Sequence, residues 1–165
     1  AAANIDPLTK IPNRRFAFNY INQLIELAKS EDKHCIAIVD IDDFKTVNDS
    51  FGHDVGDNVL RQLAQTAIKS LNSRDIFARI GGEEFVIVFP CTNIEHALTR
   101  LETLRSEVEK SNFDKHLIDR KVTISAGLSE LSNVRNTVDW LKKADVALYE
   151  SKRNGKNRVE VSITI

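Results

Sequence analysis

Short apolar runs divide the chain at regular intervals and predict the strands of a sheet. The first run, Cys35-Ile36-Ala37-Ile38-Val39, has no alternation of apolar and polar positions, which is typical of a strand buried on both faces. Further strands are predicted at residues 76–78, 85–89, 122–128 and 159–163. Gly81-Gly82 separates the second run from the third, so these two strands are expected to form a hairpin.

Between the apolar runs, hydrophobic residues recur at helical spacing. This pattern predicts amphipathic helices at Phe16–Leu27, Val55–Leu71, Ile94–Val108 and Val138–Ser151. Thr92 and Glu95 have the spacing of a capping box, which favours a helix start at Thr92. Asp6 is expected to pair with Arg14 or Arg15 where the first helix begins.

The order of the central elements is βαββαβ, which predicts an α+β fold. A strand, a helix and a second strand of one sheet normally form a right-handed crossover, so the strands at 35–39 and 76–78 should be parallel. Their C-terminal ends then share one edge of the sheet, where the hairpin turn and Asp40 are close neighbours if the strand at 85–89 returns between the two parallel strands. The prediction is a ferredoxin-like core with helices on one face, plus an N-terminal helix and a C-terminal helix and strand.

Acidic residues lie at this shared edge. Asp40-Ile41-Asp42-Asp43 ends the first strand, and Glu83-Glu84 follows the glycines of the hairpin. Converging carboxylates repel one another unless a positive charge lies between them. Oxygen ligands favour Mg²⁺ or Mn²⁺ over zinc, and His34, His53, His96 and His116 show no ligand spacing. A plain hairpin with two solvated acids explains the turn alone, but the two clusters together indicate metal-assisted phosphoryl or nucleotidyl transfer.

Composition narrows the setting. The 165 residues fit one domain, and 42% hydrophobic with 28% charged residues is ordinary for a soluble globular protein. A net charge of −1 gives no field that attracts nucleic acid or an anionic membrane, so we expect a small-molecule substrate. No apolar stretch is long enough to span a bilayer, and two cysteines without a CxxC motif favour a reduced, cytoplasmic setting. Because methionine is absent, we expect a fragment in which residues 1–5 are a linker or an artificial remnant and residues 6–165 form one domain.

Several motifs follow one another in a fixed order along the chain. They are Asp6-Pro7-Leu8-Thr9, Pro12-Asn13-Arg14-Arg15, Asp40-Ile41-Asp42-Asp43-Phe44-Lys45, Asn48-Asp49, Phe51-Gly52-His53-Asp54-Val55-Gly56-Asp57, Arg79-Ile80-Gly81-Gly82-Glu83-Glu84-Phe85 and Ala144-Asp145-Val146-Ala147-Leu148-Tyr149. Together they resemble the GGDEF-domain diguanylate cyclases in their GGEEF form, from about Asp6 to Arg158. The resemblance implies a fold like that of nucleotidyl cyclases and polymerase palms. It also implies condensation of two GTP molecules to cyclic di-GMP with release of two pyrophosphates.

The same resemblance implies roles for individual residues. Metal binding, with two Mg²⁺ or Mn²⁺ ions per site, falls to Asp40, Glu83, Glu84 and the carbonyl of Ile41. Catalysis falls to Asp40, Lys45, Glu83 and Glu84, with Glu84 as a metal ligand or general base. Substrate binding falls to Asn48 and Asp57 for guanine, to Asp43, Phe44, Lys45, Lys152 and Lys156 for phosphates, and to His53. Two simpler roles stay open: Asp57 as a negative charge near a helix start, and the lysines as basic residues at a helix end.

The chain departs from the family pattern at two places. Lys156 stands where many members have arginine, and lysine offers a point charge rather than a planar fork. Many members also bind their product through an RxxD pair, but here Asn72 replaces the arginine before Asp75, so this inhibitory site is expected to be non-functional.

Partners follow from the geometry of the product. One site holds one GTP, so two domains must face each other, and we expect a homodimer driven by a sensor or dimerising region upstream of Asp6. The alternatives are a catalytically silent GGDEF-like module that binds GTP or a protein, and a related enzyme that uses another nucleotide. The intact motif acids favour the cyclase.

Overall fold

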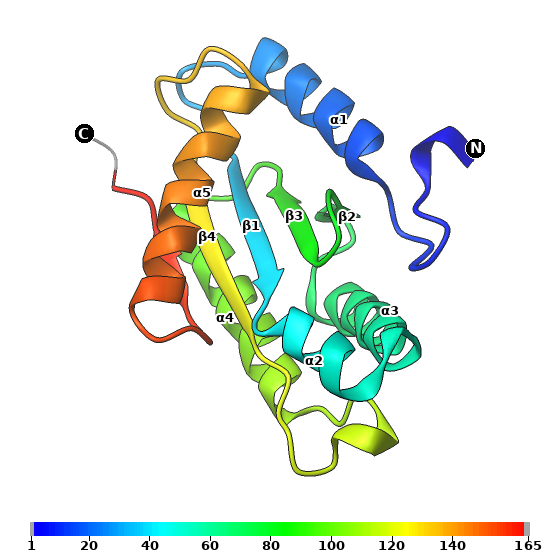
Figure 1. The fold of residues 1–165 in the computed structure, drawn as a ribbon. Coiled ribbons are helices and arrows are strands. Elements are labelled where there is room, and N and C mark those ends of the chain that lie inside the picture. Colours follow the sequence, from blue (N-terminus) through cyan, green and yellow to red (C-terminus); the bar gives the residue numbers. More distant parts are fainter. Residues whose placement is uncertain (1, 164–165) are drawn as a thin grey trace.

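The computed structural model describes residues 2–163 (Figure 1). Its helices are η1 (Ala2–Asn4), α1 (Arg14–Leu27), α2 (Phe44–Phe51), α3 (His53–Ser70), α4 (Ile94–Lys110), η2 (Lys115–Leu117) and α5 (Thr137–Arg153). Its strands are β1 (Cys35–Ile41), β2 (Ile76–Arg79), β3 (Glu84–Phe89), β4 (Ile124–Glu130) and β5 (Val159–Val161). None of the helices within 2–163 is both long enough and apolar enough to cross a membrane.

The five strands form one sheet in the order β2-β3-β1-β4-β5. Strand β3 pairs antiparallel with both β1 and β2, so β1 and β2 run parallel with β3 between them. Strand β4 is antiparallel to β1, and β5 is parallel to β4. This arrangement confirms the predicted ferredoxin-like core, and it fulfils the condition under which the hairpin turn lies next to Asp40.

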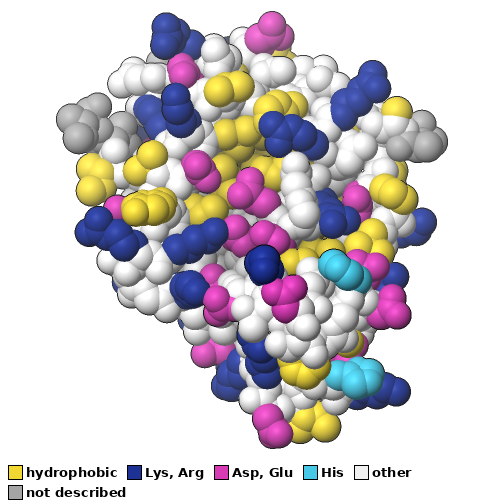
Figure 2. Space-filling model, viewed as in Figure 1, with side chains coloured by type: hydrophobic (Ala, Val, Ile, Leu, Met, Phe, Trp, Pro, Cys, Tyr) yellow, Lys and Arg dark blue, Asp and Glu magenta, His cyan; other side chains and the backbone are white. Residues whose placement is uncertain are grey.

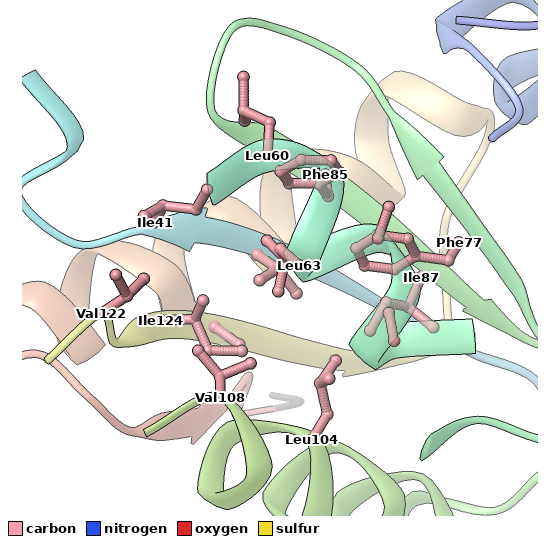
Figure 3. Packing of buried hydrophobic residues seen from close by; sticks show 14 of the residues in the cluster. Ile41, Leu60, Leu63, Phe77, Phe85, Ile87, Leu104, Val108, Val122 and Ile124 are labelled. Atoms are coloured by element: carbon pink, nitrogen blue, oxygen red, sulfur yellow. The ribbon is translucent and has the colours of Figure 1, made fainter. Parts of the chain in front are cut away.

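Helices cover both faces of the sheet. The helices of the βαββαβ core, α3 and α4, lie on one face, and the added helices α1 and α5 lie on the other (Figure 1). All seven residues of β1 are buried, as the uninterrupted apolar run predicts. Alternate residues serve different layers: Ala37 and Val39 pack toward α3 and α4, whereas Ile36 and Ile38 pack toward α1 and α5. Figure 3 shows the larger cluster, in which Leu63 of α3 and Leu104 of α4 meet side chains of the sheet.

The helices also depart from the predictions: α1, α3 and α5 begin one or two residues earlier than expected, the cap of α4 is a different residue, and α2 is an additional helix. Helix α4 has Asn93 as its N-cap, whose side chain accepts a hydrogen bond from the backbone N–H of His96, so the capping box from Thr92 was wrong. The Thr92 hydroxyl donates instead to the carbonyl of Pro90. Helix α2 was not predicted: its apolar residues Phe44, Val47 and Phe51 have helical spacing, but eight residues are fewer than the window over which such a pattern is recognised.

Helix α5 lies unusually close to strand β4, and Gly127 permits this approach. A Cβ atom at Gly127 would lie 2.1 Å from the carbonyl oxygen of Ala144 and 2.3 Å from the backbone nitrogen of Leu148. The buried hydroxyl of Ser151 donates a 2.6 Å hydrogen bond to the Ala126 carbonyl and fixes the end of the helix on the strand. The last turn of α5 is thereby held beside the C-terminal end of β1.

Replacement of Gly127 by alanine is expected to destabilise the domain by about 2–3 kcal/mol, because the new methyl group meets backbone atoms that cannot rotate away. Chemical denaturation measures the difference in free energy of unfolding, with one m-value, the dependence of that free energy on denaturant concentration, fitted to both proteins. Gly82→Ala is the matched control, since a Cβ there meets nothing within 4 Å. Equal losses in the two variants would contradict the close packing of α5 on β4.

Candidate active site

The two acidic clusters lie side by side at one edge of the sheet, as predicted. Asp40 of β1 is the register partner of Glu84 at the start of β3, and the backbone N–H of Ile41 donates to the carbonyl of Glu83 at 3.3 Å. Acidic side chains gather near the centre of the face that carries α1 and α5, beside exposed hydrophobic surface (Figure 2). Strand pairing thus brings together residues that are more than forty positions apart in the chain.

A lysine from α5 reaches this cluster. The Lys152 ammonium donates to Asp40 Oδ2 at 2.6 Å, and Asp40 is only 8% exposed. Burial raises the pKa of Asp40, and the hydrogen bond and charge of Lys152 offset only part of that effect. Burial by itself would lower the pKa of Lys152, but the hydrogen bond and charge of Asp40 outweigh it, so the ammonium form is favoured.

The carboxylates of the hairpin turn influence one another as well. Burial raises the pKa of Glu83, and the charge of Asp40 adds to the rise. Burial also raises the pKa of Glu84, and the charges of Asp40 and Asp145 raise it further. Negative charge is therefore in excess here, although Lys152 lies among these groups. Asp145 on α5 was missed by the functional assignment from sequence, and only its place in the Ala144–Tyr149 motif could have drawn attention to it.

Asp42 is close in sequence to Asp40 but has a different environment. Its carboxylate accepts hydrogen bonds from the Thr123 hydroxyl at 2.8 Å, the Ser125 hydroxyl at 2.6 Å and the backbone N–H of Asn157 at 3.0 Å. A buried carboxylate with three donors is satisfied by the protein itself. Asp42 therefore joins β1, β4 and the segment after α5, and of these two buried acids Asp40 is the one left for a ligand.

The donor set fits a magnesium-type ion. It consists of carboxylates and a backbone carbonyl, which are oxygen ligands, and burial first and neighbouring acids second raise the pKa of Asp40 and Glu83, an environment in which a cation would stabilise the ionised carboxylates. Within residues 2–163, no three Asp, Glu, His or Cys side chains are close enough to enclose a metal by themselves. One or two carboxylates with further positions for water and substrate phosphates are the usual protein share of a Mg²⁺ site.

The residues assigned to guanine binding meet where α2 packs on α3. The side-chain oxygen of Asn48 is buried and has no hydrogen-bond partner among the described residues. A Cβ at Gly56 would lie 1.8 Å from that oxygen, so the glycine makes room for the amide. Asp57, the next residue, is half-buried, and His53 is exposed at the first position of α3. An orphaned buried acceptor suits a ligand that offers N–H donors, and Asp57 supplies a second acceptor one residue after Gly56.

The residues assigned to phosphates lie around the start of α2. Asp43 has a left-handed conformation (φ 55°) and precedes the first helical residue, Phe44, so backbone N–H groups at this helix start are available for an anion. Lys156 donates to Asp43 Oδ1 at 2.7 Å. Lys45 is not brought to the carboxylates: its side chain is 90% exposed and its ammonium pairs with Asp49 at 3.0 Å.

An arginine just before the turn holds the hairpin and the N-terminal segment together. Arg79 Nε donates to the carbonyls of Gly81 at 3.2 Å and Gly82 at 3.0 Å, and its Nη1 pairs with Asp6 at 3.3 Å. The predicted pairing of Asp6 with Arg14 or Arg15 was therefore wrong. The guanidinium of Arg14 instead lies 4.4 Å from the ring centroid of Phe18 and donates to the Ile80 carbonyl.

Asp75, the remaining half of the RxxD pattern, is engaged inside the protein. Its side chain is 1% exposed and forms a two-pronged ion pair with Arg100, with distances of 3.0 Å to Nε and 3.1 Å to Nη2. The backbone N–H of Asn72 donates to the same carboxylate at 2.9 Å, and Arg100 also binds the Thr92 hydroxyl. The sequence analysis did not anticipate this partner, which comes from helix α4.

Residues 3–158 match the family described as diguanylate cyclase, GGDEF domain. The probable diguanylate cyclase DgcT of Escherichia coli (strain K12) is 39% identical over 162 residues, which cover 96% of this chain and 36% of that protein. The response regulator PleD of Caulobacter vibrioides (strain NA1000 / CB15N) is 37% identical over 160 residues, 93% of this chain and 35% of that protein. The chain thus spans about a third of the length of these curated relatives.

Solved structures agree with these matches. The GGDEF domain of DgcB from Caulobacter crescentus, in complex with c-di-GMP, has a TM-score of 0.90 at 32% identity and covers 98% of this chain and 94% of that chain. The active GGEEF domain of a diguanylate cyclase from Vibrio cholerae has a TM-score of 0.86 at 33% identity, with coverages of 93% and 98%. Fold and sequence therefore point to the same group of proteins.

The excess negative charge predicts a pH-dependent gain in stability on replacement of Glu84 by glutamine. A carboxyl group with a raised pKa binds more protons in the folded state, so stability falls as pH rises from the ordinary value of 4.5 through the folded-state pKa. Glu84→Gln should raise the melting temperature by roughly 2 °C at pH 7. The gain should vanish below about pH 4.

Thermal unfolding between pH 4 and pH 7 measures the effect. Glu107→Gln on the exposed face of α4 controls for the loss of one negative charge elsewhere. A Glu84→Gln variant that is less stable than the wild type at pH 7 would show that the acids at this edge of the sheet stabilise the ligand-free fold.

Proposed function

Because the chain belongs to the GGDEF-domain family of diguanylate cyclases, we propose that it condenses two GTP molecules to cyclic di-GMP and releases two pyrophosphates. The observation that carries this proposal is the grouping of Asp40, Glu83 and Glu84 at one edge of the sheet, next to the Lys152 ammonium. Catalytically silent members of the family would be expected to lack some of these acidic and basic side chains. A silent binding module is therefore not favoured.

Asp40, Glu83 and the carbonyl of Ile41 would hold two divalent ions, Mg²⁺ or Mn²⁺. When bound, such ions neutralise charge on the α-phosphate and pyrophosphate and favour ionisation of the attacking 3′-hydroxyl. Glu84, whose burial and acidic neighbours raise its pKa, is suited to accept a proton from that hydroxyl or to complete the ligand set. Its position opposite Asp40 keeps it within the same group of acids.

Guanine selection is assigned to Asn48 and Asp57. The unpartnered oxygen of Asn48 can accept one N–H of the base, and the carboxylate of Asp57 can accept from guanine N1–H and the exocyclic amine. Adenine does not offer donors at these places. Since leaving buried acceptors unpaired is costly, ATP should be rejected strongly.

Phosphate binding is assigned to the start of α2 and the two lysines beyond it. The backbone N–H groups at Asp43, Phe44 and Lys45 offer donors to the β- and γ-phosphates. Lys152 and Lys156 supply positive charge from the other side, because Lys152 lies against Asp40 near the end of β1 and Lys156 lies against Asp43 just before α2. His53, which is exposed at the first position of α3, is assigned to the rim of the nucleotide site.

The reaction needs two domains, since each product molecule joins two nucleotides held by separate sites. We therefore propose that a homodimer is the active form and that residues outside this chain bring the two domains together, as the greater length of the relatives allows. Because the proposed substrate is GTP, we place the reaction in the cytoplasm.

The proposal predicts that the purified chain converts GTP with Mg²⁺ to cyclic di-GMP at a rate that rises faster than linearly with protein concentration. Chromatographic separation of the nucleotides measures the product, with ATP as the comparison substrate. Glu83→Ala should reduce the rate at least about 100-fold, because it removes a metal carboxylate. Glu107→Ala, far from these acids on α4, should leave the rate unchanged.

The same assay on the chain fused to a dimeric coiled coil separates weak association from inactivity. Activity that appears only in the fusion supports the proposal. Failure of both proteins to form product from GTP, or an equal rate with ATP, would overturn it.

We further propose that the product does not bind tightly at Asp75. The carboxylate is buried in its ion pair with Arg100, and Asn72 supplies no guanidinium to grip phosphate and guanine. Calorimetric titration with cyclic di-GMP, with the nucleotide site filled by a non-reactive GTP analogue, should give no saturable heat.

Tight binding that disappears in the double variant Asp75→Ala with Arg100→Ala would refute this proposal. The double variant is the appropriate test because removing one partner alone leaves a buried, unpaired charge and costs about 3–5 kcal/mol of stability. Folding of the variant is checked by its cooperative thermal transition.

A further inference from the structure

The contact between Lys152 and Asp40 puts a positive charge on an oxygen that the proposed function requires as a metal ligand. The ammonium lies 2.6 Å from Asp40 Oδ2, and the Asp40 side chain is 11% exposed. Lys152 itself is 41% exposed, so it has room to move away, whereas Asp40 is fixed in a strand paired on both sides. The mobile partner of this pair is the lysine.

We propose that Lys152 is an internal counter-cation that competes with the divalent ion at Asp40 until substrate phosphates draw it away. This inference rests on the proposed function and adds an order to it: metal binds weakly to the protein alone and strongly together with nucleotide. Lys152 acts as a positioning residue that couples the two ligands.

Lys152 and a divalent ion compete for Asp40 because both are positively charged and would occupy neighbouring positions. An ion coordinated by Asp40 lies about 2 Å from a carboxylate oxygen, so an ammonium held by the same carboxylate would be a few ångströms from two further positive charges. In a partly buried site this repulsion is poorly screened. Binding of metal to the free protein therefore requires displacement of Lys152, which loses a charge-assisted hydrogen bond.

Nucleotide removes this obstacle by giving the lysine another anion. Lys152 is in the last turn of α5, and Ser151 anchors that turn to β4 through its buried hydroxyl. Only the flexible side chain then needs to swing from the carboxylate to a phosphate oxygen. Because coupling between two ligands is reciprocal, metal strengthens nucleotide binding by the same factor that nucleotide strengthens metal binding.

The second phosphate lysine shows the same pattern at a more exposed place. Lys156 donates to Asp43 Oδ1 at 2.7 Å, where the lysine and carboxylate side chains are 45% and 53% exposed. Both lysines are therefore held by acids before phosphate arrives, Lys152 by Asp40 near the end of β1 and Lys156 by Asp43 just before α2. The Asp40 pair differs because its carboxylate is also a proposed metal ligand, so only this exchange affects the ion.

The test is the affinity for Mn²⁺ without nucleotide, measured by calorimetry or by loss of the free-ion paramagnetic resonance signal. Lys152→Met should bind Mn²⁺ at least about fivefold more tightly than the wild type. Lys152→Arg keeps the positive charge and should not bind Mn²⁺ more tightly than the wild type. With a saturating non-reactive GTP analogue this difference in Mn²⁺ affinity should shrink, because the phosphates draw Lys152 away from Asp40, and the methionine variant should bind the analogue more weakly because it lacks a phosphate contact.

Two controls separate direct competition from a general loss of positive charge. Lys142→Met removes a charge from an exposed position of the same helix and should leave Mn²⁺ affinity nearly unchanged. In an Asp40→Asn background, Lys152→Met should have no effect on Mn²⁺ binding. Melting temperatures with and without Mn²⁺ give a second readout, in which the ion should stabilise Lys152→Met more than the wild type.

Each outcome decides a different statement. Equal Mn²⁺ affinity in the wild type and Lys152→Met would overturn the competition and leave the proposed cyclase intact. An equal gain in Lys142→Met would reduce the effect to general electrostatics and would also overturn it. Absence of Mn²⁺ binding in all variants, even with the analogue, would overturn the metal site and the inference with it.

Discussion

The burial of strand β1 on both faces is the constraint on which the site depends. The strand is the centre of the sheet, paired with β3 and β4 and covered by helices on each side. Charged residues can appear only where such a strand ends, and there the surrounding layers still limit their access to water. Asp40 and Asp42 are both nearly buried for this reason. A carboxylate in that position needs donors or a cation, and the two acids meet this need differently.

The difference between Asp40 and Asp42 separates structure from chemistry. Asp42 receives three hydrogen bonds from groups of the fold, so its charge is balanced whether or not a ligand is present. Asp40 receives one lysine, whose side chain can move and which is itself suited to bind phosphate. A neighbouring acid with fixed donors stabilises the fold, and an acid with a removable partner is free for function. Sequence position alone does not distinguish them.

Much of the arrangement could be predicted from the sequence because it follows from local periodicity and from general rules of connection. The buried strand, the crossover and the glycine turn were sufficient to bring Asp40 near Glu83. The contacts that could not be predicted join residues far apart in the chain. Asp6 pairs with Arg79 rather than the nearby Arg14, and Asp75 pairs with Arg100, because helix and strand packing decides which guanidinium reaches each carboxylate. Spacing along the sequence carries no such information.

The acids at the edge of the sheet also show why a binding site costs stability. Burial and the charges of neighbouring acids, Asp145 among them, raise the pKa of Asp40, Glu83 and Glu84, and Lys152 offsets only part of the rise. A sequence selected for stability alone would place fewer acids at a buried strand end. Helix α5 packs closely on β4 at Gly127, where only a residue without a side chain fits, and this packing holds Lys152 beside these acids. The fold thus keeps negative charge in excess at the place where a cation and a phosphate would enter, and the energy of that repulsion is available to favour their binding.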